Sequence, residues 1–249
     1  MNAPQVNDHL VLIGGESACG KSASLMHLKN PERYMYLNCE SGKRLPFPSR
    51  MKKYTITDPY QVYEAFDFAE TQPDIEGIVT DSLTYLMDMF ESIHVIPSTN
   101  TMQAWGQYAQ FFKNLMQIKV ARSSKNVIFT AHTLTELDEE AMAYKTKVPI
   151  KGSLKNQGIE SYFSVVLAAK KMKLKDLQGY QSSLLNISAE EEALGYKYVF
   201  QTRLTKATVN ERIRGPLGMW STEETFIDND VQLVMNRLHE YYAEEDAAA

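Results

Sequence analysis

The sequence has few cysteines, no long apolar run and no strong excess of either charge. Cys19 and Cys39 are the only cysteines among 249 residues, too few for a disulfide framework, so we expect a reducing compartment. No apolar run approaches the length that spans a bilayer, and the opening residues, MNAPQVND, lack the basic start and apolar stretch of a leader. We therefore expect a cytoplasmic protein with no membrane partner.

The charge is small but unevenly distributed. A formal net charge of −5 argues against polyanion binding over the whole surface. Between residues 145 and 175, however, eight lysines accompany a single acid, Glu160. The sequence thus predicts a basic band on an acidic body. The lysines of this band are Lys145, Lys147, Lys151, Lys155, Lys170, Lys171, Lys173 and Lys175.

The first half of the chain alternates strand and helix patterns, which is typical of a mostly parallel sheet covered by helices on both faces. After residue 132 the alternation stops, and hairpins and loops are expected. We predict one α/β domain over residues 1–249, with a three-layer core and β-hairpin additions. Strands are predicted at 9–13, 34–39, 77–81, 126–130, 164–169 and 196–204, and helices at 21–28, 59–70, 82–96, 102–121 and 229–242. Flexible ends are expected at 1–8 and 244–249, and mobile loops at 134–152 and 176–195.

Residues 15–22, GESACGKS, match the phosphate-loop pattern G-x-x-x-x-G-K-[ST] directly after a predicted strand. Its glycines let successive N–H groups point at a phosphate, and a helix starting near Lys21 would add the positive end of its dipole. Lys21 would reach the β and γ phosphates, and Ser22 would hold Mg²⁺. The alternative is a glycine turn that binds nothing. We predict binding of ATP with Mg²⁺ by Gly15, Glu16, Ser17, Ala18, Cys19, Gly20, Lys21, Ser22 and Ala23.

Three polar residues follow predicted strands and are candidates for the chemistry around the phosphate. Asp81 would hold the Mg²⁺ through a water, or it could only cap the helix that starts at Ser82. Glu40 could polarise the water that attacks the γ-phosphate, or it could be a surface residue of a loop. His132 could sense the γ-phosphate, or it could serve as a structural hydrogen-bonding group.

These residues resemble the RecA-like branch of the phosphate-loop ATPases. The segments YLNCESG, TDSLT, FTAHT and QTR are similar to those of Sak-type single-strand annealing proteins, which phages encode. The resemblance spans about residues 9–243. It implies a RecA-like core in which Glu40 activates water, and a protein of the host cytoplasm. It also implies a homo-oligomer, ring or filament, with a single-strand-binding protein as a possible further partner.

The resemblance implies that two loops, about 95–103 and 134–152, contact single-stranded DNA. The lysines that flank the second loop are Lys145, Lys147, Lys151 and Lys155, and they could track phosphates without reading sequence. A further basic group, Lys206, Arg212 and Arg214, could reach the nucleotide of an adjacent subunit, or it could form a hairpin that faces solvent or DNA.

Three classes of function remain open from the sequence. The leading one is a DNA-stimulated ATPase that oligomerises on single-stranded DNA and promotes annealing or homologous recombination. The second is a nucleotide or small-molecule kinase, which an arginine-rich lid would favour; the loop after His132 has no arginine. The third is a nucleotide-gated replication accessory or loader with little turnover.

Overall fold

The computed structural model describes residues 7–139 and 142–248. The predicted flexible ends therefore lie partly outside the described residues. In the described part of the N-terminal end, Asn7 is buried and its amide donates a hydrogen bond to the carbonyl oxygen of Lys125. At the other end, helix α7 (Val231–Ala248) continues well beyond the predicted 229–242.

An eight-stranded sheet forms the centre of the molecule, in the order β10-β9-β8-β1-β5-β4-β2-β3. The six strands from β8 to β3 pair in parallel, whereas β9 and β10 are antiparallel additions at one side. The bounds are β1 Leu10–Gly15, β2 Tyr34–Asn38, β3 Lys52–Thr55, β4 Gly77–Asp81, β5 Asn126–His132, β8 Val165–Lys173, β9 Tyr196–Gln201 and β10 Phe226–Asp228.

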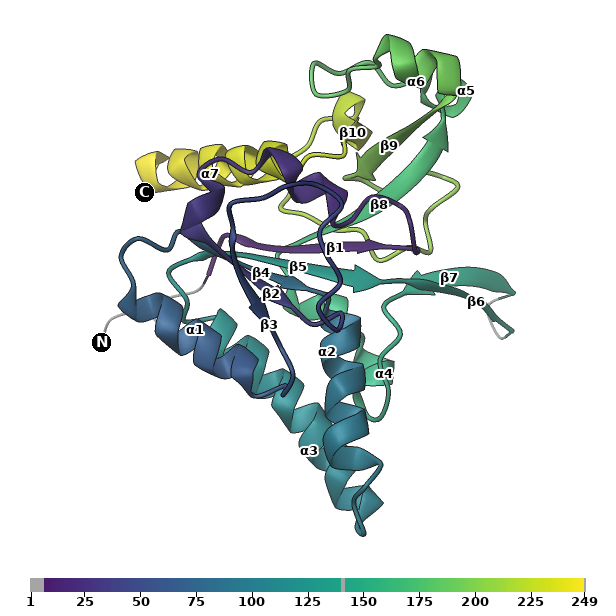
Figure 1. The fold of residues 1–249 in the computed structure, drawn as a ribbon. Coiled ribbons are helices and arrows are strands. Elements are labelled where there is room, and N and C mark those ends of the chain that lie inside the picture. The colour runs from purple at the N-terminus through teal and green to yellow at the C-terminus, as the bar shows by residue number, and fades with distance from the viewer. Residues whose placement is uncertain (1–6, 140–141, 249) are drawn as a thin grey trace.

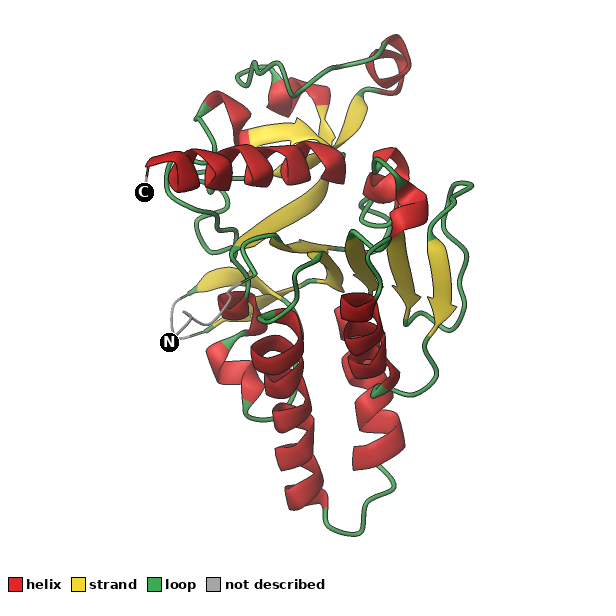
Figure 2. Cartoon of the chain, turned by 90° about the vertical axis from the view of Figure 1, so that its left-hand side faces the viewer, coloured by secondary structure: helices red, strands yellow, loops and turns green. Residues whose placement is uncertain are grey.

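Helices cover both faces of this sheet, so the predicted three-layer α/β fold is confirmed (Figures 1 and 2). Alternate residues of the buried strands point to opposite faces. Leu12 of β1 packs in the cluster that contains α1, α2 and α3, and its neighbour Ile13 packs in the cluster that contains α7. The larger helices are α1 Gln61–Thr71, α2 Leu83–Phe90 and α3 Thr101–Asn114, and π-helical turns extend two of them at Glu91–Val95 and Leu115–Val120.

The segment after the phosphate loop differs from the sequence prediction. Instead of an α-helix over 21–28, the chain forms a short 3₁₀ helix, Ala23–His27. The Ser24 hydroxyl donates to the carbonyl oxygen of Lys21 at 2.7 Å, and this local bond competes with the α-helical pattern. Asn30 then adopts a left-handed conformation before Pro31, which ends the segment. The helix dipole expected at the phosphate site is accordingly reduced to that of a short turn.

The chain after β5 forms a hairpin within residues 134–152, whose mobility stays a prediction, and residues 140–141 lie outside the described residues. Strand β6 (Leu134–Asp138) pairs with β7 (Ala143–Lys147) and projects from the main sheet. The second half also contains short helices, including α4 Leu154–Gln157, α5 Leu174–Leu177 and α6 Ala189–Leu194. None of the described helices is long and apolar enough to cross a membrane.

Candidate active site

The phosphate loop follows β1 and is tightly packed at both of its glycines. A β-carbon on Gly15 would lie 2.5 Å from the sulfur of Cys19, and Gly20 has φ +93°, which favours glycine. The Lys21 ammonium points back into the loop, donating to the carbonyl oxygens of Gly15 at 2.9 Å and Glu16 at 2.6 Å. Burial lowers the pKa of Lys21. The side chain thus stands at the centre of the loop, where a phosphate can draw it away from the carbonyls.

Asn229, just before α7, fixes the loop from outside. Its amide nitrogen donates to the carbonyl oxygen of Gly20 at 2.9 Å, while its own carbonyl oxygen is buried and has no partner among the described residues. A β-carbon on Gly20 would meet that amide nitrogen at 2.5 Å. Sequence reasoning missed this contact, because the two residues lie 209 positions apart.

Asp81 ends β4 and is almost fully buried, and three hydroxyl groups donate to its carboxylate. Ser22 donates to one oxygen at 2.8 Å and Tyr36 to the same oxygen at 2.6 Å, while Thr130 donates to the other. The carboxylate therefore faces the phosphate loop, and no bond from it caps α2 at Ser82. One strand, β5, separates β4 from β1, and it contributes Thr130.

Glu40 lies just beyond β2, with both carboxylate oxygens engaged. One oxygen is 3.0 Å from the Lys43 ammonium, and the other is 3.5 Å from Nε2 of His132. Burial lowers the pKa of His132, and the nearby Lys21 adds to this effect. The imidazole is therefore neutral at pH 7. Glu40, predicted from its place after β2, is thus held at the same edge of the sheet as Asp81.

The residues present fit ATP and Mg²⁺. Mg²⁺ prefers a few oxygen ligands and keeps several waters. The Ser22 hydroxyl and the Asp81 carboxylate, already 2.8 Å apart, offer this donor set. No cluster of three or more His, Cys, Asp or Glu side chains suited to a metal occurs among the described residues. Lys21 supplies the positive charge for the phosphates.

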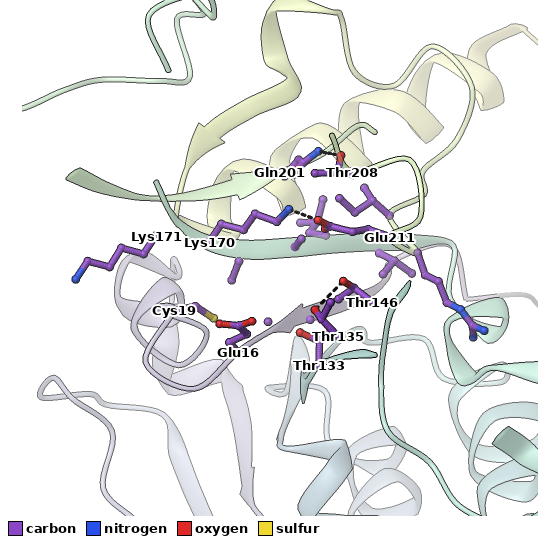
Figure 3. A pocket seen from close by; sticks show the side chains of 18 of the residues that line it. Glu16, Cys19, Thr133, Thr135, Thr146, Lys170, Lys171, Gln201, Thr208 and Glu211 are labelled. Atoms are coloured by element: carbon purple, nitrogen blue, oxygen red, sulfur yellow. Dashed lines mark hydrogen bonds and ion pairs between the residues drawn. The ribbon is translucent and has the colours of Figure 1, made fainter. Parts of the chain in front are cut away.

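A cleft of about 810 Å³ opens beside the phosphate loop (Figure 3). Glu16 and Cys19 lie on one side of it, and Thr135 and Thr146 of the hairpin on another. Its far wall comes from β8, β9 and the loop after β9, where Lys170 pairs with Glu211 and Gln201 donates to Thr208. The hairpin and the late strands therefore face residues 14–19 of the phosphate loop across one cleft, which Lys21, Ser22, Asp81 and Glu40 do not line.

The lysines expected to contact DNA are largely ion-paired. Across the hairpin Lys145 pairs with Asp138 and Lys147 with Glu136, and farther on Lys151 pairs with Glu91. Lys155, on α4, is exposed. The first expected DNA loop, 95–103, contains no lysine or arginine. The basic band of the sequence is thus interrupted by acids that folding brings to it.

The three basic residues after β9 differ in their surroundings. Lys206 is exposed and makes no ion pair among the described residues. Arg212 pairs at 2.8 Å with the buried Glu160 of its own chain, whose other oxygen accepts the backbone N–H of Val148 at 2.7 Å. Arg214 is exposed, and its backbone bridges to Val166 of β8. In the isolated chain, therefore, Arg212 stabilises the base of the hairpin.

A comparison with protein families identifies the family of the domain that contains this site. A family model described as an AAA domain matches residues 8–207, which cover the phosphate loop, Glu40, Asp81 and His132. The chain belongs to this AAA-domain family. The AAA domain is a nucleotide-binding, ATPase-type domain, and its match ends before Arg212 and Asn229. No curated protein matches the sequence.

Proposed function

We propose that this AAA domain hydrolyses ATP with Mg²⁺, binds single-stranded DNA and promotes strand annealing in recombination. The observation that carries the proposal is the convergence of Lys21, Ser22, Asp81 and Glu40 at the carboxyl ends of parallel strands, where ligands bind in α/β proteins. A phosphate-binding lysine, a metal-binding pair and a carboxylate base are the parts that phosphoryl transfer to water requires.

Each side chain has a definable part in this reaction. Lys21 would leave the carbonyl oxygens of Gly15 and Glu16 for the phosphates, and Ser22 and Asp81 would hold the metal. When bound, Mg²⁺ neutralises charge on the β and γ phosphates. Glu40 would orient a water and accept its proton, and the neutral His132 would hold the Glu40 carboxylate in place.

The DNA partner is supported by the resemblance to single-strand annealing proteins and by the hairpin, which lines the same cleft as residues 14–19 of the phosphate loop. The direct test is the ATPase rate with and without a single-stranded oligonucleotide, at 50 mM and 200 mM salt. We expect stimulation that weakens at the higher salt, because phosphate contacts release counterions. A rate indifferent to DNA would instead favour a kinase, and nucleotide binding without turnover would favour a replication accessory.

We also propose a homo-oligomer in which Lys206 reaches the nucleotide of the adjacent subunit. Lys206 suits this role better than Arg212, since it is exposed and free of an ion pair among the described residues. Mixing a Lys206→Ala protein with a Lys21→Ala protein should restore part of the ATPase activity, because a mixed boundary can combine one intact Lys21 with one intact Lys206. Absence of rescue at every mixing ratio contradicts action across a subunit boundary.

A further inference from the structure

One stretch of the chain is strongly basic and contains no acid. Residues 41–57, the 41–57 segment, follow Glu40 and include β3 at one edge of the sheet. They contain Lys43, Arg44, Arg50, Lys52 and Lys53. The hairpin region 134–147, by contrast, has four acids and two lysines. Before ion pairs with other segments are considered, the 41–57 segment therefore carries more net positive charge than the hairpin region.

Folding neutralises this segment only in part. Arg50 pairs with Glu32, Lys52 with Asp74, and Lys43 with Glu40. Arg44 and Lys53 are both exposed, and neither makes an ion pair or a side-chain hydrogen bond with any described residue. A phosphate that approached these two side chains would not have to displace a carboxylate, whereas a phosphate at the hairpin lysines would.

The two free side chains border one hollow. The register pairs Tyr36 with Lys53 and Asn38 with Thr55, so these four residues share one face of the strand pair β2–β3. The loop of residues 42–48 lies over that face and encloses a hollow of about 550 Å³, to which Arg44 also contributes. Lys43, Arg44 and Lys53 line the hollow together with apolar residues of the loop, Leu45, Pro46, Phe47 and Pro48, and no acidic side chain lines it. Three cations without an acid among the lining residues favour an anionic ligand.

We infer that the phosphodiester backbone of single-stranded DNA binds along the 41–57 segment, through Lys43, Arg44 and Lys53, and that this contact releases Glu40 for catalysis. The inference rests on the proposed function and names the DNA surface that serves it. The coupling follows from Lys43, whose ammonium is 3.0 Å from the Glu40 carboxylate and whose side chain is 73% exposed. A DNA phosphate competes for that ammonium, and the freed carboxylate oxygen can then accept a proton from water.

Lysines on an edge strand can have a different purpose, because they discourage pairing with the edge of another molecule. That purpose accounts for Lys52 and Lys53 of β3. It does not require Arg44 in the overlying loop, nor a hollow between the loop and the strand face. DNA binding accounts for all of these features together.

The binding test compares three double variants that each remove two positive charges. They are Arg44→Ala with Lys53→Ala, Lys145→Ala with Lys147→Ala in the hairpin, and Lys173→Ala with Lys175→Ala as the matched control. Affinity for a fluorescein-labelled oligothymidine is measured by anisotropy between 50 and 200 mM salt, and melting temperatures check folding. The first variant should weaken binding roughly twentyfold at 0.1 M salt. It should also reduce the slope of log affinity against log salt concentration by about 1.4, because each lost contact with a single-strand phosphate reduces that slope by about 0.7.

The inference is overturned if the first variant loses no more affinity than the hairpin variant or the control. If the unmodified protein does not bind the oligonucleotide at all, the proposed function fails and the inference fails with it. Binding by the unmodified protein together with an unaffected first variant refutes the inference alone. The two failures are therefore distinguishable.

The coupling test is Lys43→Gln, which keeps a side chain of similar length without the charge. Without DNA its ATPase rate should rise about two- to fivefold, the scale set by losing one exposed ion pair. The ratio of its ATPase rate with oligothymidine to its rate without oligothymidine should fall toward one, because Glu40 is already released. An unchanged or lower basal rate with full stimulation contradicts the coupling. Nucleotide affinity should not change, since Lys43 is outside the phosphate loop.

Discussion

The hydroxyl group of Tyr36 provides a sharp test of how the buried Asp81 is held. Tyr36→Phe removes one of three hydroxyl donors to that carboxylate and leaves the ring in place. A hydrogen bond to a charged group contributes about 1.5–3 kcal/mol. For a domain of this size, such a loss lowers the melting temperature by about 3–12 °C. Burial and the Asp81 carboxylate raise the pKa of Tyr36 far above its ordinary value, so the hydroxyl donates throughout the accessible pH range.

Tyr34→Phe is the matched control, since Tyr34 lies on the same strand and is equally buried. Its hydroxyl accepts a bond from the neutral amide of Asn126 at 3.2 Å, and a neutral bond contributes only about 0.5–1.5 kcal/mol. Thermal and urea unfolding of both variants measure the difference. A loss at Tyr36 no larger than the loss at Tyr34 refutes the view that Tyr36 stabilises a charged carboxylate.

Three further outcomes follow from the phosphate loop and the hairpin base. Gly20→Ala should destabilise the protein by about 1–3 kcal/mol and abolish nucleotide binding, because φ at Gly20 is +93° and the new β-carbon would meet Asn229. Calorimetric titration with MgATP measures the nucleotide binding. The rate of Cys19 alkylation should rise about tenfold per pH unit near neutrality, because burial raises the pKa of the thiol and only the thiolate reacts. Excess MgATP should protect Cys19 from alkylation. Arg212→Ala should cost up to about 3 kcal/mol in urea unfolding, because it leaves the buried Glu160 unpaired; an unchanged midpoint contradicts that role.

The buried parallel strands and the polar residues that follow them could be predicted from the sequence. Strands such as 77–81 are short apolar runs, and Asp81, Glu40 and His132 stand at or just beyond their ends. Parallel pairing then brings those ends to one edge of the sheet. This is why the candidate site could be assembled before the structure was known.

Other features depend on contacts that no local pattern records. Strand β3 was missed because KKYT has no apolar run and lies exposed at a sheet edge. The ion pair between Lys151 and Glu91 joins residues 60 positions apart, so the sequence around the lysines does not show that folding brings an acid to them. The contact of Tyr36 with Asp81 likewise requires the register of β2 against β4.

Glu40→Gln shows whether these residues form an ATP-hydrolysing site. The substitution keeps the size of the side chain and removes its capacity to accept a proton. The variant should bind MgATP as the unmodified protein does, while its single-turnover hydrolysis rate falls by about 10²-fold or more. A variant that still hydrolyses ATP at close to the original rate would contradict the assignment of Glu40 as the base.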